Sequence, residues 1–213
     1  MTTRDQIKAI FFDFGGVITE SPFDAFAVFE RKHGIPQNFI RKINSTNPDN
    51  NAWAQFERND INVNQFNQLF LQESKLLGHA IPGKKILSLL NVRIRPEMVD
   101  LVKECKTKYI VACLTNNIKL SPESEKARDR RFLSVYQDFH YVIESSEIGI
   151  RKPEKDFYQY ACDLVKVKPS EVVFLDDLGI NLKPAKAMGM ETIKVVDPKL
   201  AIANLQKRLD LAH

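Results

Sequence analysis

Cysteine is scarce in this sequence, and long hydrophobic runs are missing. The three cysteines, Cys105, Cys113 and Cys162, form no C-x-x-C pair and leave one over, which argues against a disulfide framework and against a zinc site. The apolar run near the start ends at Asp13 and is too short for a signal-peptide core or a membrane span. We therefore expect a cytoplasmic protein with reduced thiols and no membrane partner.

The sequence also has no basic stripe and no low-complexity linker. Its 31 lysines and arginines and 27 aspartates and glutamates are spread along the whole chain, for a formal net charge of +4. Because nucleic acids select clustered positive charge, we do not expect a nucleic acid as the partner. A chain of 213 residues without a linker predicts one sizeable domain, or a core domain with a smaller insertion.

Apolar segments predict five strands, and the first two are apolar enough to suit strands that are buried on both faces of a parallel sheet. They lie at residues 7–12, 109–114, 141–143, 172–175 and 192–196. Helical patterns are interleaved with them at residues 96–105, 124–135, 156–165, 182–188 and 198–211. In the third of these helices the pattern predicts an inward stripe of Phe157, Tyr160, Ala161 and Leu164. Strands that alternate with helices predict an α/β fold with a doubly wound parallel sheet.

Between the first two predicted strands the sequence contains helical patterns alone. They cover residues 22–33, 52–58 and 64–77, and residues 44–51 are predicted to be turns. The aromatic residues of this block are expected to pack its interior. We therefore predict an inserted α-helical cap at residues 18–95 and a core domain formed by residues 1–17 and 96–213.

Polar residues follow the predicted strands at their carboxyl ends, which meet at one crevice in a parallel sheet. They are Asp13, then Thr115, Asn116 and Asn117, then Arg151 and Lys152, and finally Asp176 and Asp177. Taken singly, each has a structural interpretation as a helix cap, a loop lysine or a turn. Together, three carboxylates, a hydroxyl and a cation suit a divalent metal, Mg²⁺, and a phosphate group.

The order of these residues resembles that of a known family, the haloacid dehalogenase superfamily of aspartate-nucleophile hydrolases. Its four motifs match Asp13-Phe14-Gly15-Gly16-Val17, Leu114-Thr115-Asn116, Lys152-Pro153 and Phe174-Leu175-Asp176-Asp177. The sequence is most similar to the phosphatase domain at the N-terminus of soluble epoxide hydrolase and to a related domain of an acyl-CoA dehydrogenase family. That likeness is strongest over residues 141–196. The helical insertion resembles that of the family only in being helical and in following the first motif.

The resemblance implies a Rossmann-like core and a role for each matching residue. Asp13 would be the nucleophile that takes the phosphoryl group, and also a metal ligand. The backbone carbonyl of Gly15 and the carboxylate of Asp177 would complete the protein ligands of Mg²⁺, and Asp176 would be a further ligand or would orient one. The groups that hold the transferring phosphoryl group would be Thr115, Asn116 and Lys152. The implied activity is a phosphatase acting on a small phosphorylated molecule.

The sequence departs from the family at Gly15. Phosphatases of the family carry an aspartate at this position, which protonates the leaving group and later activates water. Its loss removes general acid–base help of about 10²–10⁴-fold, so activity is expected to be low or narrow. Thr19 and Glu20 are candidates for a substitute.

Three other functions have to be weighed against the phosphatase. A protein without the general acid could bind metal and phosphate as an interaction module and turn over little. A 2-haloacid dehalogenase is disfavoured because its reaction needs neither a metal nor paired aspartates at the fourth strand. A receiver domain is excluded because its acidic pair would end the first strand, and here the pair is Asp176 and Asp177. The oligomeric state is left open.

Overall fold

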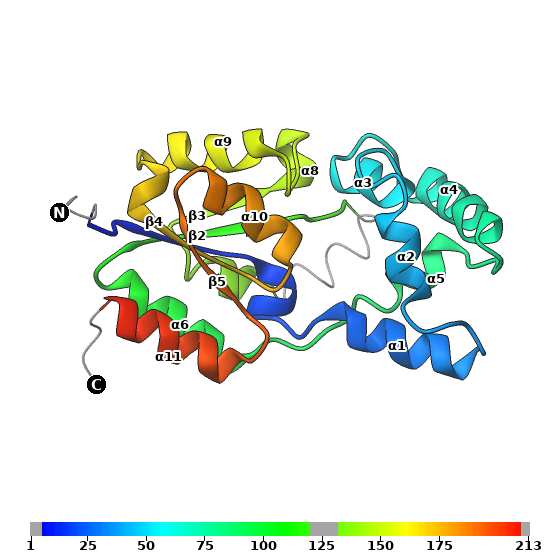
Figure 1. Ribbon diagram of the computed structural model, residues 1–213, viewed down its shortest axis with the longest axis horizontal. Helices are drawn as coiled ribbons and strands as arrows, with labels where there is room; N and C mark the ends of the chain where they lie inside the picture. Colours follow the sequence, from blue (N-terminus) through cyan, green and yellow to red (C-terminus); the bar gives the residue numbers. More distant parts are fainter. Residues whose placement is uncertain (1–5, 120–131, 210–213) are drawn as a thin grey trace.

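The computed structural model of the protein describes residues 6–119 and 132–209. Five parallel strands form one sheet in the order β3-β2-β1-β4-β5 (Figure 1). They are β1 (Ala9–Phe12), β2 (Ile110–Thr115), β3 (Tyr141–Glu144), β4 (Val172–Asp176) and β5 (Glu191–Lys194). The predicted α/β class with a doubly wound parallel sheet is confirmed.

Helices cover both faces of the sheet. Helices α6 (Pro96–Lys106) and α11 (Pro198–Leu209) lie on one face, while α9 (Lys155–Val165) and α10 (Gly179–Ala187) lie on the other (Figure 1). Strand β1 supplies alternate side chains to the two hydrophobic clusters, Ile10 and Phe12 to the first and Phe11 to the second. Burial on both faces therefore explains why this strand is apolar at every position.

The inward face of α9 differs from the predicted stripe. Phe157 and Ala161 are buried as predicted, but Tyr160 and Leu164 are 41% and 40% exposed. Tyr158 is buried in their place, and its hydroxyl donates a hydrogen bond of 2.7 Å to the backbone oxygen of Asn181 on α10. The helix has two overlapping apolar faces, one that includes Tyr158 and one that includes Tyr160. The face with Tyr158 is buried because its hydroxyl has a hydrogen-bond partner there.

Other elements fall outside the predicted set. The short helices α8 (Ser145–Ile148) and η2 (Pro169–Glu171) were not indicated by any periodicity. The predicted charged helix at 124–135 lies mostly outside the described residues, and residues 132–136 are helical. Across residues 6–119 and 132–209, no helix has the length and apolar character needed to cross a bilayer.

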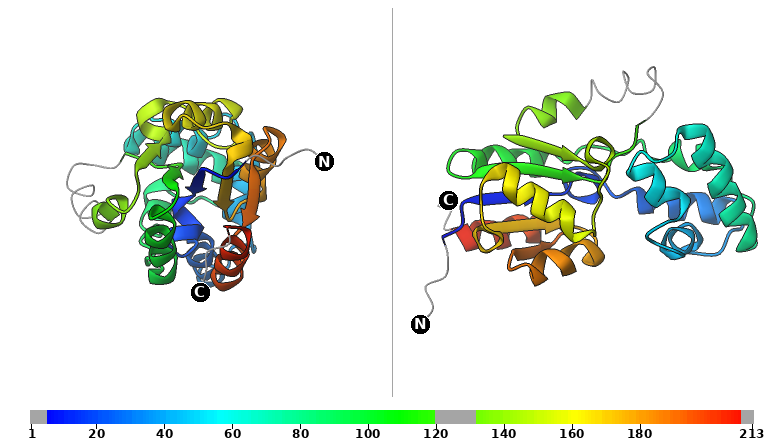
Figure 2. Two further views of the ribbon diagram at one scale, coloured as in Figure 1. Left: turned by 90° about the vertical axis from the view of Figure 1, so that its left-hand side faces the viewer. Right: turned by 90° about the horizontal axis from the view of Figure 1, so that it is seen from above.

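Five helices lie beyond the carboxyl ends of the strands and form what we call the helical unit (Figures 1 and 2). They are α1 (Pro22–Lys32), α2 (Phe39–Ser45), α3 (Ala52–Glu57), α4 (Val63–Leu76) and α5 (Gly83–Leu87). Helices α2 and α5 were not predicted. The unit packs around a hydrophobic cluster that Ile118, from the segment after β2, also joins. In this cluster the Phe66 ring lies 4.6 Å from that of Phe56 and 5.5 Å from that of Phe70.

Two chain segments connect the helical unit to the sheet, and they run side by side. The backbone N–H of Arg95 donates to the oxygen of Ile18 at 2.8 Å, and that of Glu20 donates to the oxygen of Arg93 at 2.8 Å. An antiparallel bridge joins Thr19 and Ile94 between them. These bonds lie beside residues 17–18 and 95–96, where the sequence predicts the domain boundaries. The division into two domains at these residues stays a prediction.

The topology places a crevice between β1 and β4. After β1 the chain leads to α6 on one face of the sheet, whereas after β4 it leads to α10 on the other face. In open α/β sheets, the carboxyl edge at such a reversal of direction is where ligands bind. Asp13 follows β1 and Asp176 ends β4, so both lie at this point.

We expect Phe66→Ala to destabilise the helical unit by about 3–5 kcal/mol, because it leaves a cavity between three aromatic rings. Leu76→Ala on the same helix is the matched control, since Leu76 is 86% exposed. Urea unfolding followed by circular dichroism measures both. Equal costs for the two substitutions would contradict the packing described here.

Candidate active site

A buried ammonium group lies at the centre of the crevice. The Lys152 side chain is 1% exposed, and its Nζ lies 2.8 Å from Oδ1 of Asp13 and 2.8 Å from Oδ2 of Asp176. Asp13 comes from the end of β1, Asp176 from the end of β4 and Lys152 from the loop before α9. The structure therefore brings together three residues that the sequence predicted to meet.

Both carboxylate oxygens of Asp176 are engaged by hydrogen-bond donors. Oδ1 accepts from the backbone N–H of Leu178 at 2.8 Å, and Oδ2 accepts from Lys152. The amide nitrogen of Asn181 lies 3.1 and 3.0 Å from the two oxygens. Asp176 is fully buried, so these contacts fix its orientation and, through it, the position of the lysine.

Asp177 lies against the turn that follows β1. A Cβ atom added to Gly16 would come 2.2 Å from Oδ2 of Asp177, and the φ angle of Gly16 is +78°. A glycine is needed here for both reasons, because a side chain would displace the carboxylate and strain the backbone. The turn is also held by Arg95, whose Nη1 donates to the backbone oxygen of Gly16 at 2.6 Å.

Asn116 binds the main chain of the lysine loop. Its Nδ2 donates to the backbone oxygen of Lys152 at 2.9 Å, and its Oδ1 accepts from the backbone N–H of Lys152 at 2.9 Å. Its side chain therefore orients Lys152, and its predicted phosphate contact stays a prediction. The neighbouring Thr115 lines the crevice together with Asp13, and the side chain of Asn117 binds Glu144 instead.

Burial and charge together set the protonation of these groups. Burial raises the pKa of Asp13 well above its ordinary value, and Asp176 and Asp177 add to this while Lys152 opposes it. Burial alone would lower the pKa of Lys152, but Asp13 and Asp176 outweigh it and raise that pKa, so the group stays a cation. The pKa of Asp177 is raised to about 6, first by burial and then by the charge of Asp176.

The carboxylates also suit a divalent cation. Asp13, Asp176 and Asp177 each offer an oxygen, and these atoms lie within 4.8 Å of one another. Hard oxygen donors of this kind match Mg²⁺, and a bound cation would favour the charged forms of Asp13 and Asp177. The predicted contribution of Gly15 through its carbonyl fits the same place, since Gly15 lines the crevice beside Asp13.

The crevice opens into a cavity of about 470 Å³ between the sheet and the helical unit. Its lining is mostly apolar and comes from both parts, with Phe23, Phe26, Trp53, Leu90, Ile118 and Tyr136 among the apolar residues and Arg41, Asn51 and Arg151 among the polar ones. Ligand sites in proteins commonly combine an apolar wall with a few convergent polar groups. Here the convergent groups are the carboxylates and the lysine at the base.

The sequence matches one family model over residues 7–189, the model for haloacid dehalogenase-like hydrolases. The chain belongs to this hydrolase family. Two mouse proteins have sequences similar to this chain. Acyl-CoA dehydrogenase family member 10 is 32% identical over 95% of this chain and 19% of its own length. Bifunctional epoxide hydrolase 2 is 30% identical over 94% of this chain and 38% of its own length. The chain thus spans less than two fifths of either relative.

Two further comparisons cover both partners almost completely. A sesquiterpene phosphatase from Aspergillus oryzae is 27% identical over 89% of this chain and 90% of its own. A haloacid dehalogenase family enzyme from Bacteroides thetaiotaomicron, crystallised with magnesium and inorganic phosphate, superimposes with a TM-score of 0.60 at 22% identity, over 88% and 93% of the two chains. At that identity, the superposition shows a shared haloacid dehalogenase-like fold.

Gly15 stands where the resemblance implies an acid, and the two predicted substitutes are poorly suited to replace it. The hydroxyl of Thr19 donates to the backbone oxygen of Glu20 at 3.0 Å. The Glu20 carboxylate pairs with Arg93 at 2.8 Å, and hydrogen bonds from Arg93 lower its pKa, which disfavours the protonated form that an acid needs. The structure therefore argues against both candidates.

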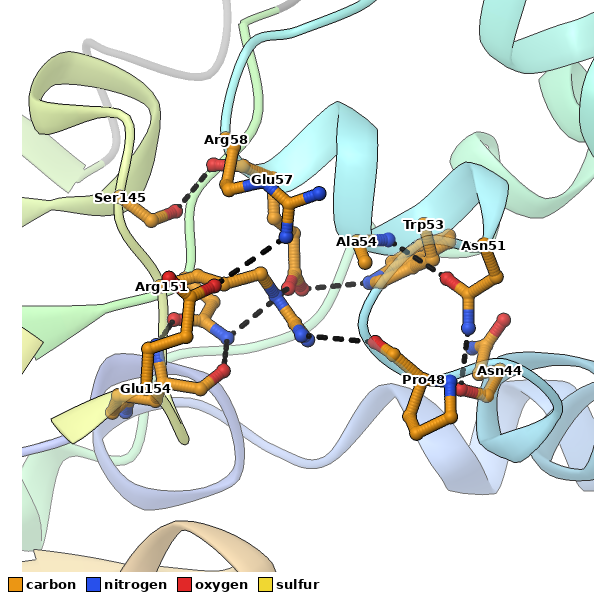
Figure 3. A network of polar contacts seen from close by, with 12 residues as sticks. Asn44, Pro48, Asn51, Trp53, Ala54, Glu57, Arg58, Ser145, Arg151 and Glu154 are labelled. Atoms are coloured by element: carbon orange, nitrogen blue, oxygen red, sulfur yellow. Dashed lines mark hydrogen bonds and ion pairs between the residues drawn. The ribbon is translucent and has the colours of Figure 1, made fainter.

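Sequence reasoning missed three residues of this haloacid dehalogenase-like site. Asn181 binds Asp176, Arg95 binds the Gly16 turn, and Glu57 of the helical unit contacts the loops that carry Asn116 and Arg151 (Figure 3). Asn181 stands one helical turn beyond the paired aspartates, which is a usable sequence signal. Arg95 and Glu57 meet partners far away in the sequence, so local periodicity contains no such signal.

We expect Asp177→Asn to raise the stability of the metal-free protein at pH 7.5, by up to about 3 kcal/mol, because it removes a carboxylate that is costly to ionise. The pKa of this group is raised from 3.8 to about 6, so the folded state holds a proton that the unfolded chain has released between these values. The parent therefore gains stability as the pH falls through this window. Thermal melting in chelator at pH 7.5 and 5.0 should show the advantage of the variant shrinking at the lower pH.

Added Mg²⁺ provides the second readout for this variant. At pH 7.5 it should raise the melting temperature of the parent and raise that of Asp177→Asn less, because the variant has lost an anionic ligand. An equal response of both proteins to Mg²⁺ would remove Asp177 from the set of metal ligands.

Proposed function

We propose that the protein is a Mg²⁺-dependent phosphatase with Asp13 as its nucleophile. The paired contacts of Lys152 with Asp13 and Asp176 support this most strongly, because they place a fixed cation beside a carboxylate at the ligand-binding edge of the sheet. Lys152 and Thr115 would bind the phosphoryl oxygens, and Asn116 would hold the lysine loop. Asp177 and the carbonyl of Gly15 would hold the metal with Asp13.

The proposed reaction has two steps. The carboxylate of Asp13 attacks phosphorus, the ester P–O bond breaks, and the leaving group departs with its electron pair. Water then hydrolyses the aspartyl phosphate and releases inorganic phosphate. Bound Mg²⁺ would offset the repulsion between carboxylate and phosphate and polarise the phosphoryl oxygens. Lys152 stabilises charge on the equatorial oxygens, and Asp176, whose oxygens are all engaged by donors, orients the lysine.

The substrate we propose is a phosphate monoester with an apolar group. The cavity that continues from the carboxylates is walled by aromatic and aliphatic side chains of the sheet domain and the helical unit. The name of the fungal relative, a sesquiterpene phosphatase, agrees with such a substrate. In this proposal, residues 18–95 form a cap that supplies the specificity of a core made of residues 1–17 and 96–213.

Gly15 supports a second candidate, an interaction module that binds metal and phosphate with little turnover. The glycine removes the usual acid, and Glu20 and Thr19 are engaged elsewhere. The two candidates differ in one measurable property, which is hydrolysis of phosphate esters that Asp13→Asn abolishes. A rate unaffected by this substitution would exclude the phosphatase and indicate contamination.

We expect Gly15→Asp to accelerate alkyl phosphate hydrolysis, by up to about 10²–10⁴-fold, and to affect acyl phosphates much less. The backbone of Gly15 (φ −70°, ψ 126°) accepts any residue, and a Cβ there meets no atom within 4 Å. In the parent, turnover should fall in the order acyl, aryl, alkyl phosphate, because alkoxide leaving groups most need a proton. Release of inorganic phosphate measures all three.

Gly15→Ala is the control for this substitution, since it adds the Cβ without a carboxyl group and should not restore alkyl phosphate turnover. A parent enzyme that already hydrolyses alkyl and aryl phosphates at equal rates would show that another group supplies the proton.

We expect Ile180→Ser to raise the KM for phosphates with a long apolar chain several-fold and to leave that for acetyl phosphate unchanged. Ile180 lines the cavity and is 58% exposed, so little stability is at stake. Val196→Ser, at a residue that is 78% exposed and away from the cavity wall, is the matched control. If both substitutions have the same effect on KM, the apolar wall does not bind the substrate.

A further inference from the structure

We propose that Glu57, at the end of α3 in the helical unit, is a positioning residue for Lys152. Through Glu57, the position of the lysine ammonium depends on the position of the helical unit relative to the sheet. The inference rests on the proposed function, since it takes Lys152 as the group that binds the transferring phosphoryl. Glu57 lines the cavity, and among the described residues its carboxylate bonds to Trp53, Asn116 and Arg151 rather than to Asp13, Asp177 or the ammonium of Lys152. Its effect runs through Asn116 and the loop that carries the lysine.

The first link is the carboxylate of Glu57, which is buried and surrounded by donors (Figure 3). Oε2 accepts from Nε of Arg151 at 2.6 Å and from Nδ2 of Asn116 at 3.1 Å. Oε1 accepts from Nε1 of Trp53 at 2.7 Å. The backbone oxygen of Glu57 accepts from the hydroxyl of Ser145 at 2.6 Å, which fixes the end of α3 on the sheet domain.

The second link is Asn116, whose amide binds the main chain of Lys152 through both of its polar atoms. The same Nδ2 is shared between Glu57 and the backbone oxygen of Lys152. Rotation of this amide would therefore break contacts to the helical unit and to the lysine loop together. Arg151, the residue before the lysine, bonds to the same carboxylate, so Glu57 contacts the loop directly at Arg151 and through Asn116 at Lys152.

The third link is the lysine side chain. It is 1% exposed and ends between Asp13 and Asp176, so it has no room to compensate for a shift of its own backbone. A displacement of the main chain at residue 152 must therefore move Nζ relative to the carboxylates. Misplacement of a catalytic group by about 1 Å can cost about 10²-fold in rate.

A carboxylate is required at residue 57 because each of its oxygens faces donors. An isosteric glutamine would turn its NH₂ group either toward Asn116 and Arg151 or toward the N–H of Trp53, and would lose contacts in both orientations. The substitution Glu57→Gln thus disturbs the network without changing volume.

A second ion pair crosses the same interface and offers a matched control. Nη1 of Arg58 lies 3.4 Å from Oε1 of Glu154, and the Glu154 side chain is 40% exposed. The side chain of Asn116 bonds to Glu57 and to the main chain of Lys152, not to this pair. Glu154→Gln therefore weakens the seating of the helical unit without breaking the path to the lysine.

The experiment compares Glu57→Gln and Glu154→Gln with the parent in steady-state hydrolysis of p-nitrophenyl phosphate with Mg²⁺. We expect Glu57→Gln to lower kcat by about 10- to 100-fold with a small change in KM, because the phosphoryl-binding lysine is misaligned for every substrate. Glu154→Gln should stay within about twofold of the parent. Equal losses of kcat in the two variants would overturn the inference, since any weakening of the contact between the helical unit and the sheet would then have the same effect.

Hydrogen exchange gives a readout that is independent of activity. The backbone N–H of Lys152 donates to Asn116, so peptides that span Lys152 should exchange faster in Glu57→Gln than in the parent or in Glu154→Gln. Unchanged exchange in Glu57→Gln would overturn the coupling. If the parent hydrolyses no phosphate ester, the proposed function fails, and the exchange result still decides whether Glu57 controls the lysine loop.

A second pair of variants covers the case in which Glu57→Gln melts below the assay temperature. Arg151→Met removes the ion pair from the other side and should accelerate the same exchange and lower kcat. Arg151→Lys keeps the charge, so its hydrogen exchange at Lys152 and its kcat should both be close to those of the parent. Identical behaviour of the methionine and lysine variants would overturn the part assigned to the Glu57–Arg151 contact.

Discussion

The burial of the Lys152 ammonium is the constraint on which the rest of this structure depends. A cation that is 1% exposed persists in a protein interior only beside opposite charge, and Asp13 and Asp176 supply it at 2.8 Å each. These carboxylates come from the ends of two adjacent parallel strands, β1 and β4. The register of β1 against β4 and the geometry of the site therefore depend on each other. A shift of either strand would leave the buried ammonium of Lys152 without one of its carboxylate partners.

Two further contacts extend this requirement outward. Gly16 allows Asp177 to approach the turn after β1, and Arg95 holds that turn from the start of α6. The helical unit has its own hydrophobic cluster, yet its Glu57 enters a buried polar network with the loops after β2 and β3 (Figure 3). Apolar packing thus stabilises each part mostly from within, with Ile118 after β2 joining the cluster of the helical unit. Polar contacts relate the position of the helical unit to that of the lysine.

Much of the fold was predictable, and all five predicted strands are present. The central strands β1, β2 and β4 are buried and therefore need apolar runs, whereas the edge strands β3 and β5 are only partly buried. The predictions failed where the local pattern was short or ambiguous. Helix α5 contains 5 residues, and the last two residues of α2 lie in the segment 44–51 that was predicted to be turns. Helix α9 buries Tyr158 in place of Tyr160, and the hydroxyl of Tyr158 has a partner on α10. Thr19 and Glu20 are poorly suited as acids because neighbouring groups already engage them.

The sequence by itself determined the α/β class and the shared edge of Asp13, Thr115, Lys152 and Asp177, since parallel strands bring their carboxyl ends together whatever the details of packing. Tertiary structure alone decided which groups pair at that edge. Glu57 and Arg151 are 94 residues apart, and Asn116 and Lys152 are 36 apart, yet each pair is in hydrogen-bond contact. Local periodicity records which face of a segment is buried, whereas hydrogen bonds between distant segments depend on side-chain positions that arise only after those segments have packed.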